Sequence, residues 1–408
     1  MFSNNNQTNF THQLIFGLVA TFLCGLGFSI VMPVTPFLVS PYVNNANQQA
    51  LVVTLLMSTY AVCVFLTAPI IGYFSDRFGR RPVLLFSLLG ATLGFLIFGL
   101  ANSLEMLFLG RIIEGITGGS IATIFAYFAD ITPEKDRTKY FGWISAVAGF
   151  GTVMGPTIGG LLTKFGNSTP LFLAASISFL NFILGYFVMK ETVVKEEKLE
   201  KISLTALNPI NQMKGLFANK SVRIILFLGF LLWVPNGALQ SILSQFSIDT
   251  FQLSPSQIGM VFSIIGIQDI LSQVFVMPKL LLKKSDRQIV SLGITFQLLG
   301  YSFIVFSQIS SMIVLFIVGM LLFGFGESIF SPAFNGLLSK SVSKSEQGKI
   351  QGGSQSIQSL ARIFGPLIGG QLYVYAGHFA PAVMGICLSI MAIWLSSKVI
   401  RLQLVKDN

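Results

Sequence analysis

The chain has 408 residues, of which 53% are hydrophobic and 10% are charged, with a formal net charge of +10. Soluble domains carry about 25% charged residues, so this composition excludes an ordinary soluble fold. A membrane-spanning helix needs about 20 consecutive apolar residues, and about ten to twelve crossings account for the apolar content of this chain.

Apolar runs bounded by polar, Gly or Pro residues predict twelve membrane-spanning helices in two sets of six. The first six lie near residues 12–39, 51–74, 82–101, 105–130, 139–164 and 169–190. The second six lie near residues 221–248, 256–282, 288–307, 312–339, 349–375 and 379–397. A polar, charged stretch separates the two sets. We therefore expect an all-α membrane protein with an N-terminal bundle at 1–190, a linker at 191–220 and a C-terminal bundle at 221–408.

The basic residues accumulate on one side of this arrangement. Lys and Arg favour cytoplasmic loops close to the spans. If the amino terminus is cytoplasmic, nearly all of them fall on that side, and Lys164 is the only one outside. The positive charge therefore indicates topology rather than nucleic-acid binding. We expect a multi-pass protein of the cell membrane with both termini in the cytoplasm.

The two sets of spans repeat one plan. A shift of 210 residues lays Asp76 on Asp286 and the pair Gly155-Pro156 on Gly365-Pro366. Matches in a charged loop and in a glycine-rich span at the same offset make coincidence improbable. Two six-helix repeats joined by a charged linker are typical of secondary transporters that work by rocking.

The loop between the second and third predicted spans carries the most specific motif. It runs from Gly72 to Pro82, with the following motif residues: Gly72, Asp76, Arg77, Gly79, Arg80 and Arg81. Gly72 would allow close helix approach and Gly79 a tight turn. The acid and the arginines would interact with a helix end, with carboxylates or with lipid phosphates. A loop that is merely positive inside explains the arginines but not this spacing.

The fifth predicted span contains a second pattern, built from small residues four apart. Its members are Gly151, Gly155, Pro156, Gly159 and Gly160. Small residues at this spacing let a neighbouring helix pack closely, and a proline bends the span. Ordinary helix packing is the plain alternative reading of this pattern.

Both motifs resemble those of the major facilitator superfamily, and the glycine-proline pattern resembles its drug:proton antiporters. Further short motifs are similar to the tetracycline efflux branch: Leu109-Gly110-Arg111, Phe141-Gly142-Trp143, Gln347-Gly348 and Gln351-Gly352. The resemblance covers nearly the whole chain and is weakest in spans seven to nine. It implies two six-helix bundles with pseudo-twofold symmetry and export of a drug such as a tetracycline in exchange for protons.

Two acidic residues lie within predicted spans. Charges there are costly, by about 2.5–3.5 kcal/mol at a helix centre, and usually face the bundle interior. Asp269 lies in span eight and Glu327 in span ten, each with polar neighbours on the same face. In apolar surroundings a carboxylate takes up a proton more readily, which is the basis of proton exchange. In the resembled exporters a titratable residue occupies the place of Asp269. A structural pair or hydrogen bond is the alternative for each acid.

Arg111 and Glu114 stand three residues apart in span four, so they can neutralise one another on one helix face. In the resembled family the arginine at this position is associated with proton coupling. The sequence leaves simple pairing and proton coupling both open.

Polar strips at helical spacing are the candidate substrate contacts. Span seven offers Trp233, Asn236 and Gln240, and span eight adds Gln273 beside Asp269. Span eleven offers Gln355, Gln358 and Arg362, and this arginine could pair with Asp269, Glu327 or an anionic substrate group.

The sequence thus predicts a secondary transporter that exports a small amphipathic compound and functions as a monomer in the lipid bilayer. No nucleotide-binding loop is present, so an ion gradient must supply the energy, and the resemblance implies that the ion is the proton. No cofactor, metal or nucleic acid is expected. An importer of a metabolite on the same fold is the first alternative. A membrane receptor would be expected to carry a large soluble extension, and an enzyme would need a nucleophile-base pair or a metal cluster, and the sequence shows none of these features.

Overall fold

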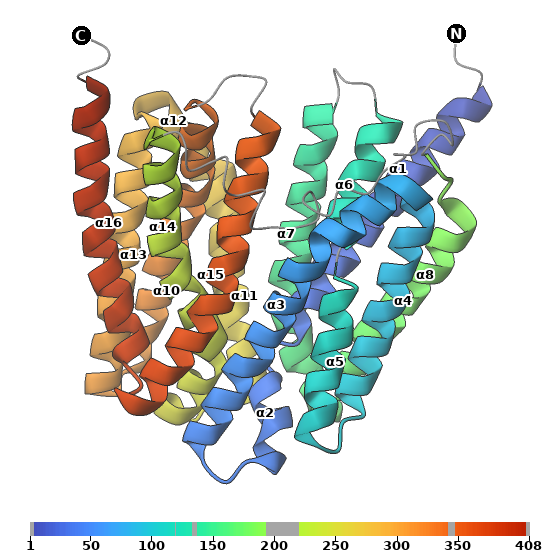
Figure 1. Ribbon diagram of the computed structural model, residues 1–408. Helices are drawn as coiled ribbons and strands as arrows, with labels where there is room; N and C mark the ends of the chain where they lie inside the picture. Colours follow the sequence, from blue (N-terminus) through green and yellow to red (C-terminus); the bar gives the residue numbers. More distant parts are fainter. Residues whose placement is uncertain (1–3, 119, 133–136, 193–219, 342–346, 405–408) are drawn as a thin grey trace. The chain divides into compact units, whose positions relative to one another are not determined.

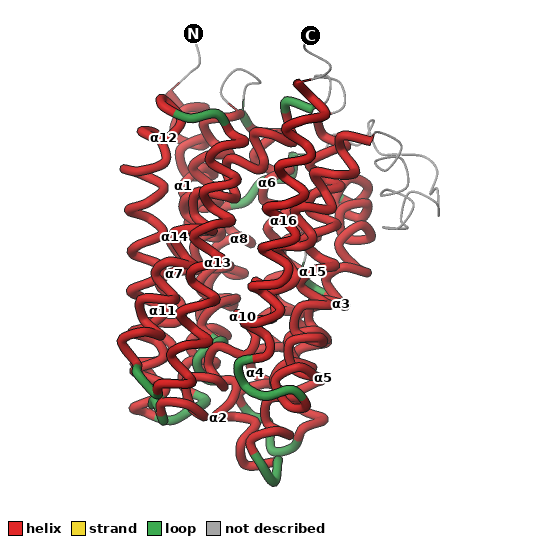
Figure 2. Tube along the Cα trace, turned by 90° about the vertical axis from the view of Figure 1, so that its left-hand side faces the viewer, coloured by secondary structure: helices red, strands yellow, loops and turns green. Residues whose placement is uncertain are grey.

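A computed structural model describes residues 4–118, 120–132, 137–192, 220–341 and 347–404. Throughout these ranges the chain is helical, joined by short turns, and contains no strand (Figure 2). The expectation of an all-α protein is confirmed for the described part of the chain. Most of the predicted linker, apart from its first two residues and its last, lies outside these ranges.

The helices follow the predicted spans closely (Figure 1). The N-terminal half contains α1 (Asn4–Ile30), α2 (Thr35–Val39), α3 (Ala46–Phe78), α4 (Arg80–Gly99), α5 (Leu104–Ile116), α6 (Ser120–Ile131), α7 (Arg137–Leu162) and α8 (Thr169–Val188). The C-terminal half contains α10 (Lys220–Phe251), α11 (Pro255–Leu271), α12 (Met277–Lys283), α13 (Asp286–Ser310), α14 (Ile313–Ser339), α15 (Gln347–Tyr375) and α16 (Ala380–Leu404).

Three predicted spans are interrupted, which the apolar pattern did not indicate. The first is divided into α1 and α2 around Pro33, because a proline cannot donate a helical backbone hydrogen bond. The fourth is divided into α5 and α6 where Thr117 and Gly118 follow the last turn of α5. The eighth is divided into α11 and α12 by a π-helical turn at Ser272–Val276.

The π turn has a local cause. Pro278 lies at the start of α12 and has no N–H for the carbonyl of Val274, one helical turn earlier. The backbone N–H of Met277 instead donates to the carbonyl of Ser272, five residues back. Single π turns of this kind are frequent at functional sites in helices.

Nine of the described helical stretches are long and apolar enough to cross a membrane by length and composition alone. The other predicted spans correspond to the divided α5–α6 segment, to the Gln- and Gly-rich α15, and to α16, whose apolar part covers Ala380–Ser396. The polar residues of α15 lower its hydropathy. Its composition alone therefore does not identify it as a membrane-spanning helix.

Contacts group the chain into two units. The first unit consists of Met1–Tyr42, Thr59–Pro209 and Pro255–Met260. The second consists of Val43–Ser58, Ile210–Ser254 and Val261–Asn408.

The two units repeat the same helix packing. In the first, α1 packs against α7 and α8, and α4 packs against α5 and α8. In the second, α10 packs against α15 and α16, and α13 packs against α14 and α16. The repeat in the sequence is therefore matched by a repeat of helix neighbours.

Glycines bring the central helices of each unit into backbone contact. A Cβ added at Gly155 of α7 would lie 2.7 Å from the carbonyl oxygen of Leu26 in α1. A Cβ added at Gly365 of α15 would likewise lie 2.7 Å from the carbonyl oxygen of Val234 in α10. No side chain fits at such distances, so the glycine-proline patterns of spans five and eleven are the surfaces where these helix pairs meet.

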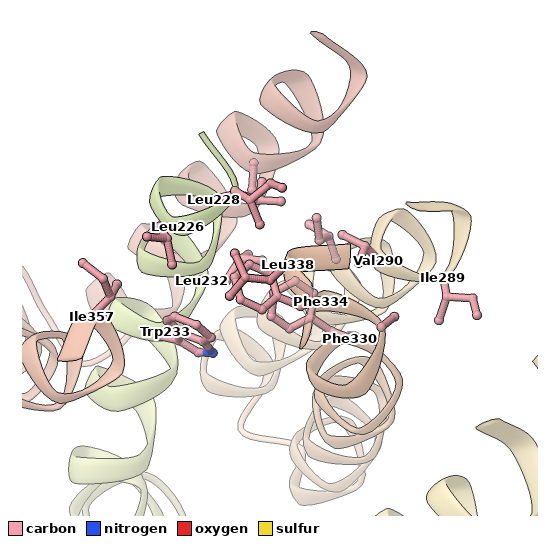
Figure 3. Close-up of a cluster of buried hydrophobic side chains, with 14 of the residues drawn as sticks. Leu226, Leu228, Leu232, Trp233, Ile289, Val290, Phe330, Phe334, Leu338 and Ile357 are labelled. Carbon is pink, nitrogen blue, oxygen red and sulfur yellow. The ribbon is translucent and has the colours of Figure 1, made fainter. Parts of the chain in front are cut away.

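The second unit has a continuous hydrophobic core between α10, α13, α14 and α15 (Figure 3). Leu232 and Phe334 are fully buried there, and Trp233 is 9% exposed. The rings of Trp233 and Phe334 make an edge-to-face contact with centroids 5.0 Å apart. This core holds α10 against α14. Asn236 and Gln240 lie on α10, and Glu327 lies on α14.

The contact between α1 and α7 gives a testable prediction. In Gly151→Ala the new methyl group would press on the carbonyl oxygen of Phe22 and lie 3.0 Å from the backbone nitrogen of Leu26, so the helices must separate. We expect the free energy of unfolding to fall by about 1–3 kcal/mol. Thermal unfolding of the purified protein in detergent measures the change.

Gly149→Ala is the matched control on the same helix. A Cβ at Gly149 would meet nothing within 4 Å, and alanine favours the helix over glycine by about 1 kcal/mol. The control should unfold at the wild-type temperature or above it. Equal destabilisation by both substitutions would contradict the assigned contact.

Candidate functional site

The sequence predicted a loop from Gly72 to Pro82, but only Gly79 lies between α3 and α4. At this junction Arg80, the first residue of α4, binds two acidic side chains. Its guanidinium forms an ion pair with Asp76, and its Nε donates to Oδ2 of Asp130 in α6 at 3.1 Å. The Ser75 hydroxyl accepts a further hydrogen bond from Arg80 at 3.1 Å. The acid and this arginine of the motif therefore tie the end of α3 to the start of α4 and to α6.

Glu191 caps the first turn of α4, a role that the sequence did not reveal. Its Oε1 accepts from the backbone N–H of Arg80 at 2.9 Å, and its Oε2 accepts from that of Arg81 at 3.3 Å. A carboxylate at a helix N-terminus satisfies free N–H groups and the helix dipole. Gly79 makes room for it, because Gly79 has a φ of 113° and any Cβ there would collide with the Glu191 carboxylate.

The other two arginines of the motif, Arg81 and Arg77, contact tyrosine residues. Arg81 donates to the backbone carbonyl of Tyr186 in α8 at 2.6 Å and lies over the ring of that residue. Arg77 donates to the Tyr73 hydroxyl at 3.1 Å.

The expected role of Gly72 in close helix approach is not supported by the structure. A Cβ at Gly72 would meet nothing within 4 Å. No described helix packs closely against α3 at Gly72, so the spacing of the motif did not identify a helix contact.

Arg111 and Glu114 form a buried ion pair on α5. The Arg111 guanidinium lies 2.8 Å from Oε2 of Glu114, and the side chains are 3% and 7% exposed. The guanidinium also lies over the ring of Phe98, 4.4 Å from the centroid. Nε and one terminal nitrogen of Arg111 have no hydrogen-bond partner. The pair therefore neutralises itself, and the guanidinium keeps donors that are not used.

The acids of the second unit have a different environment. Asp269 is partly buried on α11, and its Oδ1 accepts from Nε2 of Gln273 at 3.0 Å. Gln273 belongs to the π turn that follows and lies four residues after Asp269, a spacing that brings two side chains onto one face of a helix. Among the described residues Asp269 makes no ion pair.

Glu327 is partly buried on α14 and is also contacted by amides. Its Oε2 accepts from Nε2 of Gln297 in α13 at 2.9 Å, and Asn236 of α10 lies within hydrogen-bonding reach. Asp269 is close enough to interact with it electrostatically. In the described part of the chain no cation is paired with Glu327 either. Two carboxylates thus share one region of low polarity without a counter-charge.

The predicted strips join this region only in part. Gln240 donates to the side-chain oxygen of Asn236 at 2.6 Å, so Asn236 connects it to Glu327. Gln355 and Arg362 are exposed on α15, and Gln358 donates to the Ser354 hydroxyl at 3.5 Å. The suggested ion pair of Arg362 with Asp269 or Glu327 is not formed.

Trp233, which the sequence predicts as a substrate contact, is 9% exposed. Its ring packs into the hydrophobic core against Phe334 (Figure 3). Helical spacing placed Trp233 near the polar strip of α10, but its side chain turns toward α14 instead.

Sequence analysis also missed Gln297 and Tyr301 on α13. Both are fully buried, and Gln297 binds Glu327 directly. A signal was present, since the two polar residues lie four apart in an apolar span with Gly293 and Gly300 on either side. The spacing alone, however, does not show which residue of a neighbouring helix lies opposite them.

This arrangement can exchange a small cation. A partly buried carboxylate without a counter-ion is stabilised either by hydrogen bonds to its charged form or by taking up a proton. Asp269 and Glu327 lie near enough to influence one another, so protonation of one changes the charge that the other experiences. The amides around them can also bind polar groups of a ligand.

Comparisons with known proteins agree with this architecture. A family model described as the Major Facilitator Superfamily matches residues 17–247 and 225–403. The tetracycline resistance protein of class C from Escherichia coli is 35% identical over 362 residues, which cover 89% of this chain and 90% of that protein. The multidrug resistance protein 2 of Bacillus subtilis (strain 168) is 29% identical and covers 92% of this chain and 94% of its own.

Solved structures show the same fold. The human organic anion transporter MFSD10 (TETRAN) superposes with a TM-score of 0.72 at 21% identity, covering 95% of this chain and 99% of that one. The nucleoside transporter NupG superposes with a TM-score of 0.75 at 14% identity, covering 95% of this chain and 98% of that one. At these identities the likeness concerns the fold alone.

The buried pair on α5 gives a second prediction. Arg111→Met or Glu114→Gln alone leaves one buried charge without its partner, and we expect each to lower the free energy of unfolding by about 3–5 kcal/mol. The double substitution removes both charges and should cost clearly less than the sum. Chemical unfolding of the four proteins in detergent forms a double-mutant cycle. Additive effects would show that the two side chains do not interact.

Proposed function

The chain belongs to the Major Facilitator Superfamily, and we propose that it is a proton-coupled exporter of small amphipathic compounds, either tetracyclines or several drugs. The observation that carries the proposal is the pair Asp269 and Glu327, held by amides without a counter-charge. Similarity to tetracycline and multidrug resistance proteins over about nine-tenths of the chain supports export as the direction.

In the proposed cycle, protons enter from outside and protonate Asp269 and Glu327 while substrate is released. The protein then changes the side to which its binding region opens, and proton loss to the cytoplasm restores the charged, substrate-binding form. A charge that crosses a potential of 100 mV provides about 2.3 kcal/mol, somewhat more than a tenfold concentration ratio requires. One proton per substrate is therefore useful but limited. The Arg111–Glu114 pair is a further proposed participant, because the guanidinium keeps unused donors.

The polar surface near the acids is the proposed substrate site. Asn236, Gln240 and Gln273 offer amides beside Glu327 and Asp269, and the strip of Gln355, Gln358 and Arg362 on α15 offers further amides and a positive charge. An amphipathic drug with hydroxyl, carbonyl and amide groups matches this chemistry.

The junction between α3 and α4 is proposed as a gate. Its ion pair between Arg80 and Asp76, and the cap that Glu191 provides, join helix ends through polar contacts that can open and close. The glycines of α7 and α15 are proposed to act as packing surfaces.

We further propose that the protein works as a monomer with its six-helix bundles at 1–190 and 221–408, joined by the linker 191–220. It would lie in the cytoplasmic membrane with both termini in the cytoplasm. The concentration of Lys and Arg in the loops of that side supports this orientation.

Transport in liposomes tests the coupling. Purified protein is reconstituted, a pH gradient is imposed, and uptake of tetracycline against its gradient is followed. Asp269→Asn and Glu327→Gln cannot exchange protons at these positions, so we expect proton-driven uptake to fall to the level of protein-free liposomes. Exchange of labelled for unlabelled tetracycline, which needs no net proton movement, should weaken as well, because neither variant reaches the charged form that binds the substrate.

Glu105→Gln is the control for loss of a negative charge, because Glu105 is exposed in the first turn of α5. It should transport as the wild type does. Intact proton-driven uptake in Asp269→Asn would refute the coupling role of that residue, and movement of drug and protons in the same direction would refute export. Susceptibility of cells with and without the gene, with a proton uncoupler added, shows which drugs are substrates.

A further inference from the structure

The side chain of Gln297 is completely buried, yet only one end of its amide is used. Nε2 donates to Oε2 of Glu327 at 2.9 Å. Oε1 is enclosed by protein and has no hydrogen-bond partner. A buried amide oxygen without a hydrogen bond lowers the stability of the folded protein. Its presence next to a carboxylate therefore needs an explanation.

The helix packing fixes Gln297 against α14. Gly293 and Gly326 bring α13 and α14 into contact, since a Cβ on Gly293 would lie 2.8 Å from the carbonyl oxygen of Gly326. A Cβ on Gly326 would lie 2.7 Å from the backbone nitrogen of Gln297 and 2.9 Å from its Cγ. Gly326, the residue before Glu327, therefore contacts the Gln297 side chain close to its backbone. This contact directs the amide of Gln297 toward the carboxyl group of Glu327.

Four groups face Glu327 from the helices around it. They are Asn236 from α10, Asp269 from α11, and Gln297 and Tyr301 from α13. The side-chain oxygen of Asn236 already accepts a hydrogen bond from Gln240 at 2.6 Å, so part of its accepting capacity is taken. Asp269 is an acid itself. Gln297 is the amide in this group that has both a donor on the carboxylate and an unused acceptor.

A carboxyl group that exchanges protons needs both functions. As a carboxylate it only accepts hydrogen bonds, whereas as a carboxylic acid it must also donate one. A partner with donors alone stabilises the first form and leaves the second with an unsatisfied O–H group. A primary amide satisfies both, because half a turn about its last side-chain bond exchanges nitrogen and oxygen.

We propose that Gln297 is a positioning residue for proton exchange, which serves both protonation states of Glu327 with the two ends of one amide. This inference rests on the proposed function, in which Glu327 carries a proton. In the charged form Nε2 donates to the carboxylate, as in the structure. When a proton from the aqueous side forms an O–H bond on Glu327, that O–H donates to Oε1, and the amide itself neither gains nor loses a proton.

Infrared difference spectroscopy and transport together test the proposal. The protein is reconstituted in liposomes and titrated from high to low pH, and the carbonyl stretch of protonated Glu327 is identified as the band that Glu327→Gln removes. In Gln297→Met, which keeps the length but has no polar group, this band should move to higher wavenumber, as expected for a carboxylic acid that has lost one of its hydrogen bonds. Proton-driven tetracycline uptake should fall about tenfold, the factor expected for one hydrogen bond to a charged group, while tetracycline exchange stays unchanged.

Two further variants keep the test decisive. Tyr301→Phe lies one turn away on the same buried face of α13, and its hydroxyl also has no partner. It should shift the band and lower the uptake far less than Gln297→Met does, because the Tyr301 hydroxyl makes no hydrogen bond to Glu327. Gln297→Asn keeps both amide functions on a shorter side chain, so its band should move part of the way. If Gln297→Met does not fold, this variant alone decides.

The outcomes are distinguishable from failure of the proposed function. A band that stays in place in both Gln297 variants, or that moves only in Tyr301→Phe, overturns the assignment of Gln297. If Glu327→Gln removes no band at all, Glu327 takes up no proton, and the proposed coupling fails together with this inference.

Discussion

A charge buried among helices needs a partner, and the two units of this protein meet that need in opposite ways. In the first unit Glu114 is neutralised by Arg111 at 2.8 Å, within one turn of α5. In the second unit Glu327 and Asp269 receive hydrogen bonds from the amides of Gln297 and Gln273 but no positive charge. An ion pair stabilises only the charged form of a carboxyl group, whereas an amide can form hydrogen bonds with both its charged and its protonated form. The part of the protein suited to exchange is therefore the part where the counter-charge is absent.

The amides can act in this way only because the helices around them are held closely. Glycines join α1 to α7 in the first unit and α10 to α15 and α13 to α14 in the second, at distances where a single methyl group would not fit. Close-packed helices transmit displacement as rigid bodies and do not absorb it by side-chain rearrangement. Polar contacts that are weaker and easier to exchange, such as those of Arg80 and Glu191, lie at the ends of helices. Rigid interior packing and exchangeable ends suit a protein whose parts move without losing their internal structure.

Much of this arrangement was predictable from the sequence, because in a membrane the length and polarity of each apolar run leave few choices. The positions of the helices, the internal repeat and the all-helical class followed from spacing. Spacing also made a pair of Arg111 and Glu114 possible without deciding between pairing and proton coupling. The interruptions at Pro33, Thr117 and Ser272 did not follow from spacing, since local backbone hydrogen bonds decide them. The burial of Trp233, the cap by Glu191 and the contact of Gln297 with Glu327 were also not predictable from spacing. These features join residues far apart in the chain or depend on which way a side chain turns. Periodicity shows which face of a helix is polar but not which neighbour lies opposite.

The π turn at Ser272–Val276 also bears on how relatives of this protein diverge. It holds one residue more than a regular helix would and begins three residues after Asp269. Gain or loss of a single codon at this point rotates all later side chains of the span by about 100° relative to those before it, while the loops on both sides keep their lengths. Selection could thus replace the groups displayed beside the acid in one mutational event, without repacking the bundle.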